Sequence, residues 1–240
     1  MCGRIALYTP PSRFATYLDA SLGAAYEAAA DPPSWNLPPT LHLPGALNAP
    51  NGQGRVLSRF RWGLLPVWAK DLSFSNRTFN ARAETVAEKP SFRSAFKSRH
   101  LLLPIDGYYE WSTLGPVRKQ PHYITRADGQ PLVCAGLWEE WRDPTAPEGT
   151  SGIIRSCTII TTAANADVGH LHDRIPVVLD PEHFEEWLDV EGTDKERFLA
   201  MCAPAPQGTL VHHPVSKAVG AVRNDGPELI EPVADEGALL

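Results

Sequence analysis

Strand-forming segments dominate the middle of this chain and constrain its fold more than any other feature. Turn residues separate four runs rich in β-branched and aromatic residues: LLLPIDGYYEW, HYITRA, LVCAGLWEEW and SCTIITTAA. No helical pattern alternates with these runs, which argues against a regular βαβ fold. The sequence therefore predicts an α+β domain in which helices lie at the edges of an antiparallel or mixed, barrel-like sheet.

The flanking regions add further elements. We expect strands at residues 4–8, 41–49 and 55–68, with a turn at NGQG joining the last two. Prolines disfavour helical geometry in the residues before them, so residues 31–40, DPPSWNLPPT, are expected to form a stiff loop.

Helices are expected near both ends of the chain. Apolar residues at the spacing of one helical stripe predict a helix over residues 12–29, with Ser12 as its N-cap. Shorter helices are expected within residues 83–99, 181–190 and 193–203.

Length and composition indicate one globular domain. A chain of 240 residues with 43% hydrophobic residues can form a sizeable core, and we expect a single domain over residues 2–232 with a loose tail at 233–240. No run has the length of a membrane span and the N-terminus lacks the layout of a secretory signal, so a cytoplasmic protein is expected. A monomer is sufficient for everything that follows.

The four cysteines are widely separated and form no C-x-x-C pair. This spacing predicts reduced thiols, with neither a disulfide framework nor a cysteine metal site. We expect no cofactor.

Charge is unevenly distributed along the chain. The net charge of −6 argues against a protein that binds nucleic acid over its whole surface. Residues 55–100 nevertheless contain ten Lys/Arg and three acids, a net charge of +7, while the rest of the chain is at −13. Such a basic sector indicates either a local anionic ligand or an ordinary solvated face, and charge alone leaves both open.

A cysteine at the second position carries the clearest chemical signal. Removal of Met1 exposes a residue with a free α-amine and a thiol on adjacent carbons. The α-amine has a reference pKa of about 7.7–8.0, so part of it is unprotonated and nucleophilic at neutral pH. These two groups make Cys2 a candidate nucleophile rather than a packing residue.

Three other motifs place polar side chains among apolar neighbours. FNARAET contains Asn80, Arg82 and Glu84, GYYEWS contains Glu110, and HLHDRIPVVL contains His170, His172, Asp173 and Arg174. A buried carboxylate or imidazole is costly unless it has a partner or a catalytic role. Glu110 is therefore either an acid/base group or part of a salt bridge with Arg82 or Arg174. The two histidines are either functional or ordinary core or loop residues.

Seven blocks follow one another along the chain: MCGR, WNLPPT, RWGLLPVW, FNARAET, GYYEW, HLHDRIPVVL and VSKAVGAVRNDGPELIEP. In their order and spacing the chain resembles the SRAP family, the SOS-response-associated peptidases that sense abasic DNA, from residue 2 to about residue 232. WNLPPT is a variant of the commoner YN-x-x-P-T. Val219 and Gly220 stand where many relatives carry Val-Asn.

The resemblance implies a single α+β SRAP domain that binds single-stranded DNA and crosslinks to the aldehyde of an abasic site. Matched position by position, it implies that Cys2 is the nucleophile, Asn80 positions the site, Glu110 is the acid/base group and His172 is the histidine of the site. It also implies a thiol peptidase and lyase-like activity. Only Met1 precedes Cys2 here, so ordinary aminopeptidase trimming would be sufficient.

The chemistry of Cys2 agrees with this reaction. The α-amine attacks the aldehyde first, and the thiol then adds to the neighbouring imine to close a five-membered thiazolidine. We expect Glu110 to accept a proton from the α-ammonium and later to assist reversal, and His172 to assist opening of the sugar ring. Asn80 is expected to hold the deoxyribose or the Cys2 amine.

Cationic and aromatic residues complete the expected DNA site. The candidates for contacts with flanking phosphates are Arg4, Arg77, Arg82 and Arg174, with Arg82 the strongest. Trp62 and Trp68 either stack on exposed bases or pack in the core. The expected partner is single-stranded DNA with abasic sites, bound with little sequence preference and strong salt dependence.

Three rival functions remain open at this point. An N-terminal-nucleophile amidohydrolase would use the same Cys2 on a small amide. A metal-dependent nuclease would use His170, His172, Asp173 and Glu110, although H-x-H-D alone is a weak ligand pattern. A pure binding module would hold DNA without reacting with it.

Overall fold

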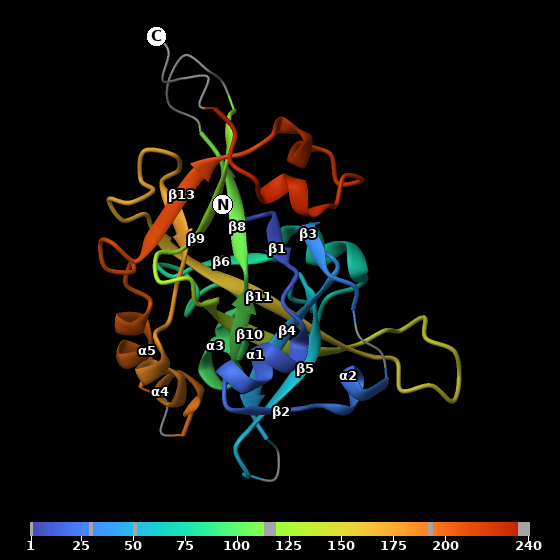
Figure 1. Ribbon diagram of the computed structural model, residues 1–240. Coiled ribbons are helices and arrows are strands. Elements are labelled where there is room, and N and C mark those ends of the chain that lie inside the picture. Colours follow the sequence, from blue (N-terminus) through green and yellow to red (C-terminus); the bar gives the residue numbers. More distant parts are fainter. Residues whose placement is uncertain (1, 29–30, 50–51, 113–118, 192–193, 235–240) are drawn as a thin grey trace.

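The computed structural model describes residues 2–28, 31–49, 52–112, 119–191 and 194–234 (Figure 1). Five of its strands form a closed barrel: β4 (His42–Asn48), β5 (Arg55–Trp62), β7 (His100–Ile105), β10 (Leu132–Arg142) and β11 (Ile153–Ala163). Antiparallel pairing runs in the order β11-β10-β7-β4-β5, and parallel pairing of β5 with β11 closes the ring. The remaining strands of this sheet pair with strands of the barrel.

Three short strands extend the barrel sheet. β2 (Ala20–Leu22) pairs with β5, while β6 (Asn80–Arg82) and β12 (Arg174–Pro176) both pair with β11. β6 and β12 carry two of the predicted motifs, so the C-terminal half of β11 brings FNARAET and HLHDRIPVVL together.

A second sheet holds the amino-terminal segment. Its order is β13 (Leu210–Pro214), β9 (Pro121–Arg126), β8 (Gly107–Trp111), β1 (Ile5–Leu7) and β3 (Ser34–Leu37), with every neighbouring pair antiparallel. Figure 1 shows β1 next to β8. Because β1 begins three residues after Cys2, this sheet fixes the direction in which the chain leaves Cys2.

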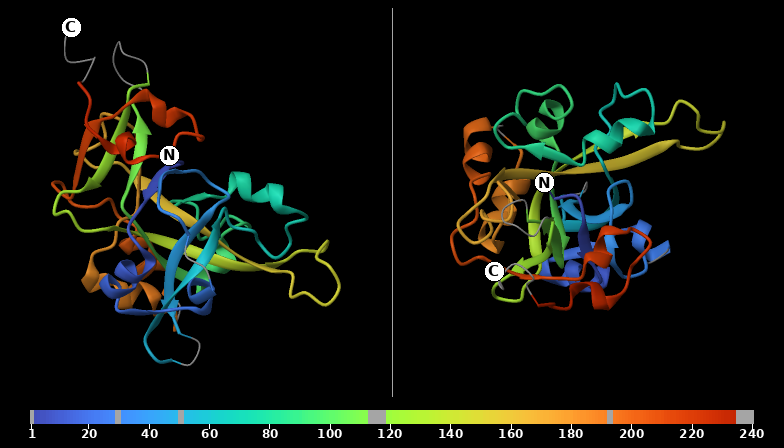
Figure 2. Two further views of the ribbon diagram at one scale, coloured as in Figure 1. Left: turned by 45° about the vertical axis from the view of Figure 1, so that its right-hand side comes forward. Right: turned by 90° about the horizontal axis from the view of Figure 1, so that it is seen from above.

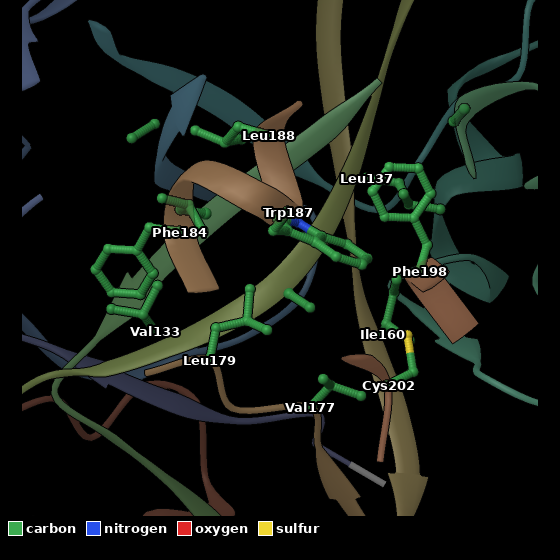
Figure 3. Close-up of a cluster of buried hydrophobic side chains, with 14 of the residues drawn as sticks. Val133, Leu137, Ile160, Val177, Leu179, Phe184, Trp187, Leu188, Phe198 and Cys202 are labelled. Carbon is green, nitrogen blue, oxygen red and sulfur yellow. The ribbon is translucent and has the colours of Figure 1, made fainter. Parts of the chain in front are cut away.

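The barrel strands are buried on both faces, which explains their almost continuous apolar sequences. On β7, Leu102 packs in a cluster with residues of the helices, whereas Leu101 and Leu103 pack in a second cluster that also contains Cys2. Figure 3 shows the first cluster, where Trp187 of α4 (Phe184–Leu188) and Phe198 of α5 (Lys195–Met201) pack against the sheet.

The prediction of one long helix over residues 12–29 is wrong. The chain forms α1 (Pro11–Tyr17), β2 and α2 (Ala24–Ala28), and residues 29–30 lie outside the described part. Asp19 adopts a positive φ of 48°, which ends α1, and pairing of the next residues with β5 then prevents helix formation. Pro10, not Ser12, occupies the N-cap, without a side-chain capping bond.

Two other segments differ from expectation. Residues 31–40 are not only a loop, because β3 forms within them and pairs with β1. The strand expected over 55–68 ends at Trp62, because Gly63 turns the chain with φ of 125° where a Cβ would lie 2.4 Å from the Ser75 carbonyl oxygen. Residues 83–99, where one or two short helices were expected, contain one α-helix, α3 (Arg93–Ser98).

The remaining predictions of secondary structure hold. Strands occur within 4–8, 41–49 and all four central runs, short helices occur within 181–190 and 193–203, and the α+β class is confirmed. The NGQG turn is described only from Gly52 onward, and most of the expected tail, residues 235–240, lies outside the described part. Within the described residues, no helix combines the length and hydrophobicity that a bilayer span requires.

Two further views in Figure 2 show the helices on the outside of the sheets and the β10–β11 hairpin extending away from the rest of the chain. β10 and β11 pair from Gly136 with Ile159 out to Arg142 with Ile153, so this arm is a direct continuation of the barrel.

Candidate active site around Cys2

Cys2 lies three residues before the start of β1 and is fully buried in the cluster that the barrel shares with the second sheet. The side-chain Nδ2 of Asn80 donates a hydrogen bond of 2.6 Å to the backbone carbonyl oxygen of Cys2. Asn80 begins β6, where its backbone is in register with Ile159 of β11. The barrel therefore supplies a residue that holds the backbone of Cys2.

Glu110 reaches the same place through strand alternation. β8 and β1 pair with Tyr108 opposite Ile5, and the Tyr109 amide donates to the Arg4 carbonyl at 2.9 Å. Successive side chains of a strand point to opposite faces, so Tyr108 and Glu110 share the face of Ile5, while Tyr109 packs in a separate cluster. Glu110 is only 5% exposed, which places a buried carboxylate at the site.

The site holds its thiol in the protonated form. Burial raises the pKa of Cys2 well above its usual value, and the nearby Cys134 and Glu110 raise it further. Tyr108 is also fully buried, and burial, followed by the nearby Cys2 and Glu110, raises its pKa. Since a thiolate is the nucleophilic form of cysteine, the Cys2 sulfur needs a base before it can attack.

The amide of Asn80 has one unused hydrogen-bonding atom. Its Oδ1 is buried and accepts no hydrogen bond from the described residues. Buried polar atoms are nearly always paired, so this oxygen is suited to a donor that arrives with a ligand or with the processed amino terminus. A sugar hydroxyl and the ammonium group of Cys2 both have the required N–H or O–H.

His172 lies two residues before the start of β12 and is half-buried. Its Nδ1 accepts a 2.9 Å hydrogen bond from the Arg174 amide and lies 3.0 Å from Oδ1 of Asp173. The catalytic role of His172 stays a prediction.

Arg174 forms a salt bridge with Glu84. Its Nη2 donates to Oε2 of Glu84 at 2.9 Å and to the Thr161 carbonyl at 2.6 Å. Arg174 is almost fully buried, and its charge already has a partner. Sequence reasoning offered Arg174 as a partner for Glu110 or for a phosphate. The structure shows a carboxylate of the same FNARAET motif as its partner, and the phosphate contact stays a prediction.

Two histidines without a sequence motif also belong to this region. His122 and His212 share a hydrogen bond between their Nδ1 atoms at 3.1 Å, and the ring of His212 lies 4.9 Å from that of His170. Sequence reasoning singled out only His170. The two-residue period of β8 and β9 would have placed His122 on the face of Glu110, provided that the pairing of these strands was known.

The two tryptophans of RWGLLPVW have opposite environments. Trp62 is fully buried, and its indole Nε1 donates to the Phe79 carbonyl at 2.8 Å. A ring with no exposed face cannot stack on a base, so the prediction of a DNA contact for Trp62 is corrected to a core role. Trp68 is 52% exposed and packs nearly perpendicular to the ring of Phe74, so about half of its surface is accessible and the contact with a base stays a prediction.

The candidate phosphate ligands also divide by environment. Arg4 donates to Oδ1 of Asn36 at 2.7 Å and to the Val219 carbonyl at 3.0 Å, so it supports the fold locally. Arg77 is exposed above the ring of Phe74. Arg82 is exposed, and its guanidinium forms no hydrogen bond or ion pair with the residues that the structure describes.

Gly220, which stands where many relatives carry asparagine, lies in a segment that is held by backbone contacts. Asn36 holds this segment through main-chain oxygens, donating to the carbonyls of Val219 at 3.2 Å, Ala221 at 3.1 Å and Asn224 at 2.7 Å. A Cβ at position 220 would meet nothing within 4 Å. A side chain there would project into open space, so its absence leaves the local packing intact.

The ligand set expected for a metal-dependent nuclease differs from the cluster that the fold creates. Among the described residues, Asp180, Glu182 and His183 bring ligand atoms within 4.8 Å of one another. This trio lies at the surface, and Asp180 is already bonded to Arg126. It includes none of the residues proposed for a nuclease.

Comparisons with known proteins agree with the motifs. The family model described as SOS response associated peptidase (SRAP) matches residues 1–222. "Abasic site processing protein YoqW" of Bacillus subtilis (strain 168) is 36% identical over 232 residues, covering 96% of this chain and 99% of the relative. "Abasic site processing protein HMCES" of Xenopus tropicalis is 31% identical over 265 residues, covering 95% of this chain and 77% of the relative.

A solved structure shares the fold. A crystal structure of a protein from Bacteroides thetaiotaomicron superposes with a TM-score of 0.83 at 21% sequence identity, covering 97% of this chain and 100% of that chain. The family match spans most of the chain, and the relatives match it over nearly its whole length. The chain therefore belongs to the SOS response associated peptidase family.

Proposed function

We propose that this chain processes abasic sites in DNA by forming a covalent crosslink through Cys2 once Met1 has been removed. The observation that carries the proposal is the position of Cys2 beside the amino terminus, held by Asn80 and buried against Glu110. The names of the relatives, which describe abasic site processing, support the same reaction.

The reaction balances without a cofactor. The α-amine of Cys2 adds to the aldehyde carbon of the opened sugar, and loss of water gives an imine. The thiol then adds to the imine carbon, and its proton ends on nitrogen, which closes the thiazolidine. Because sulfur and imine belong to one residue, the second step gains the effective molarity of an intramolecular reaction.

Glu110 supplies the base that both steps need. The amine must lose a proton before it attacks, and the raised pKa of Cys2 means that sulfur also starts as a thiol. Asn80 holds the backbone of Cys2 and offers its Oδ1 to the ammonium or a sugar hydroxyl. His172 assists ring opening of the sugar.

The DNA partner is a single strand that carries the abasic site. A single strand exposes the damaged sugar without the cost of unpairing. Arg77, Arg82 and Trp68 are exposed candidates for its phosphates and bases. Several other arginines of the basic sector already have partners, since Arg59 is paired with Asp31 and Arg99 with Glu139.

Several finer features belong to the same proposal. The functional unit comprises residues 2–232, acts as a monomer and works in the cytoplasm. Peptidase and lyase-like activities would use the same Cys2, Glu110 and His172.

Intact-mass spectrometry of the purified full chain tests the proposal. With a single-stranded oligonucleotide that contains one abasic site, we expect the mass of the chain without Met1 plus the oligonucleotide minus one water. Cys2→Ala should form no adduct that survives denaturation while it still binds DNA. An equally durable adduct with Cys2→Ser would contradict the thiazolidine. Turnover of glutamine without any DNA adduct would favour the amidohydrolase.

A further inference from the structure

A row of histidines leads away from Glu110. β8 and β9 pair with Glu110 directly opposite His122. Directly opposed residues of an antiparallel pair share one face of the sheet, with Cβ atoms about 4.5–5.5 Å apart. Both side chains are buried, at 5% and 6% exposure. A carboxylate and an imidazole are thus neighbours within the sheet.

The next step crosses from β9 to β13. His122 and His212 meet through their Nδ1 atoms at 3.1 Å, because the register places His212 opposite Ile124 and thus diagonal to His122 on the same face. A hydrogen bond between two imidazole nitrogens needs one N–H and one lone pair, so the neutral pair shares a single Nδ1 proton. Protonation of His122 on its other nitrogen can therefore be relayed to His212.

The last step reaches the surface at His170. The centroid of its ring lies 4.9 Å from the centroid of the His212 ring. The loop that carries His170 is fastened to the start of β13, because Asp167 accepts hydrogen bonds from the amides of Gly208 at 2.9 Å and Leu210 at 3.1 Å. Burial decreases along the series, from the buried His122 through the half-buried His212 to the exposed His170.

The proposed crosslinking reaction creates a need for this path. With a reference pKa of about 7.7–8.0, the α-amine is mainly an ammonium at neutral pH. An ammonium, a thiol and an aldehyde yield a thiazolidine, one water and one proton. We infer that His122, His212 and His170 relay that proton from the buried Glu110 to solvent, an inference that rests on the proposed function.

The surrounding charges suit proton transfer. Asp167 lies close enough to His212 for their charges to interact and would stabilise a transient imidazolium. Tyr108 and Arg126 share the sheet face with the relay, but Arg126 is held by two aspartates. Among the described residues, the cluster with metal-ligand spacing lies elsewhere, at Asp180, Glu182 and His183.

Single-turnover crosslinking of the full chain in dilute, weakly proton-carrying buffer tests the relay. We expect His170→Ala and His122→Phe to react about ten-fold slower than the unmodified chain, less than the roughly hundred-fold or larger effect of a general acid or base that acts directly on the substrate. In concentrated imidazole buffer His170→Ala should return to near the original rate, because a diffusing imidazole replaces the missing surface carrier, whereas the phenylalanine that fills the buried position 122 leaves no room for one. DNA affinity should be unchanged. His183→Ala, which removes an exposed histidine outside the row, is the matched control.

The outcomes separate the relay from the reaction it serves. An unmodified chain that forms no adduct refutes the proposed function. If the chain crosslinks but the variants match it in dilute buffer, or if imidazole does not restore the rate of His170→Ala, the relay is wrong. Slower reaction of the unmodified chain with EDTA would indicate a metal site instead.

A second test does not depend on crosslinking. ¹⁵N NMR should show one shared Nδ1 proton in the His122–His212 pair, and the pH at which the two rings gain a proton should change in Glu110→Gln. Independent titration of the two rings would overturn the inference.

Discussion

The side-chain amide of Asn80 donates a 2.6 Å hydrogen bond to the carbonyl oxygen of Cys2. The backbone of Cys2, the residue proposed to react with DNA, is thus held by a residue of the barrel sheet. The two residues are 78 positions apart, and β6 brings them together through its pairing with β11. A nucleophile held in this way loses little freedom on reaching the aldehyde, which favours the intramolecular second step.

Replacement of Asn80 by aspartate should slow crosslinking. A carboxylate at this position cannot donate to the Cys2 carbonyl, and the loss of about 1 kcal/mol corresponds to roughly five- to ten-fold in rate. Single-turnover rates on a denaturing gel measure the effect. Asn76→Asp changes an exposed asparagine nearby and should react normally. Equal rates for both variants would show that the hydrogen bond does not position the nucleophile.

Stability should fall at alkaline pH because of the buried thiols. Burial raises the pKa of Cys134 and Cys202 to about 12, and it also raises the pKa of Cys2 and Cys157. A group with a raised pKa in the folded state contributes its full stability below its unfolded pKa, about 8.5 for cysteine, and loses it as the pH rises towards the folded value. Between pH 8.5 and 9.5 each thiol should lower the free energy of unfolding by about 1 kcal/mol.

Urea denaturation at pH 7.5, 8.5 and 9.5 measures this loss. This window lies below the reference pKa of about 10 for tyrosine and lysine side chains, so cysteine dominates it. Cys202→Ala should remove about a quarter of the slope. A slope that does not change in this variant would mean that the thiols are not its cause.

Arg82→Gln should weaken binding to single-stranded DNA and reduce its salt dependence. Removing one phosphate contact lowers the slope of log affinity against log salt by about 0.7 for a single strand. Fluorescence anisotropy at several salt concentrations gives that slope. Arg13→Gln removes an equally exposed charge from α1 and is the control. The same slope in Arg82→Gln and in the unmodified chain would remove Arg82 from the DNA site.

Trp68→Ala should weaken DNA binding, whereas Trp62→Ala should weaken the fold. Loss of one stacked base costs about 1–3 kcal/mol, so the affinity of Trp68→Ala should fall about ten-fold or more while its unfolding free energy changes little. Truncation of the fully buried Trp62 should cost about 3–5 kcal/mol of stability. Normal DNA affinity of Trp68→Ala would place the strand on another surface.

Strand patterns explain why much of the fold was predictable. The central runs are buried on both faces, so their apolar character is continuous and their residues were recognised as strands. The prediction of a helix over residues 12–29 failed because a contact between distant segments overrides the local pattern. The apolar spacing of these residues favours a helix, but pairing of Ala20–Leu22 with β5 outweighs that local preference.

The candidate site was only partly predictable. Cys2, Asn80 and Glu110 belong to motifs that can be recognised along the chain, and the structure joins them at one place. His122 and His212 have no such motif. Their contact depends on the pairing of β9 with β13, whose residues lie 90 positions apart.

By itself, the sequence determined the chemical groups and their local geometry: an amine and a thiol on Cys2, alternating strands, and the motifs that identify the family. Only the tertiary structure decided which of two nearby tryptophans is exposed, that Arg174 pairs with Glu84, and that a histidine row adjoins Glu110. The physical reason is that local patterns set which face a side chain occupies. Burial and pairing depend on strand register between segments that are distant in the chain.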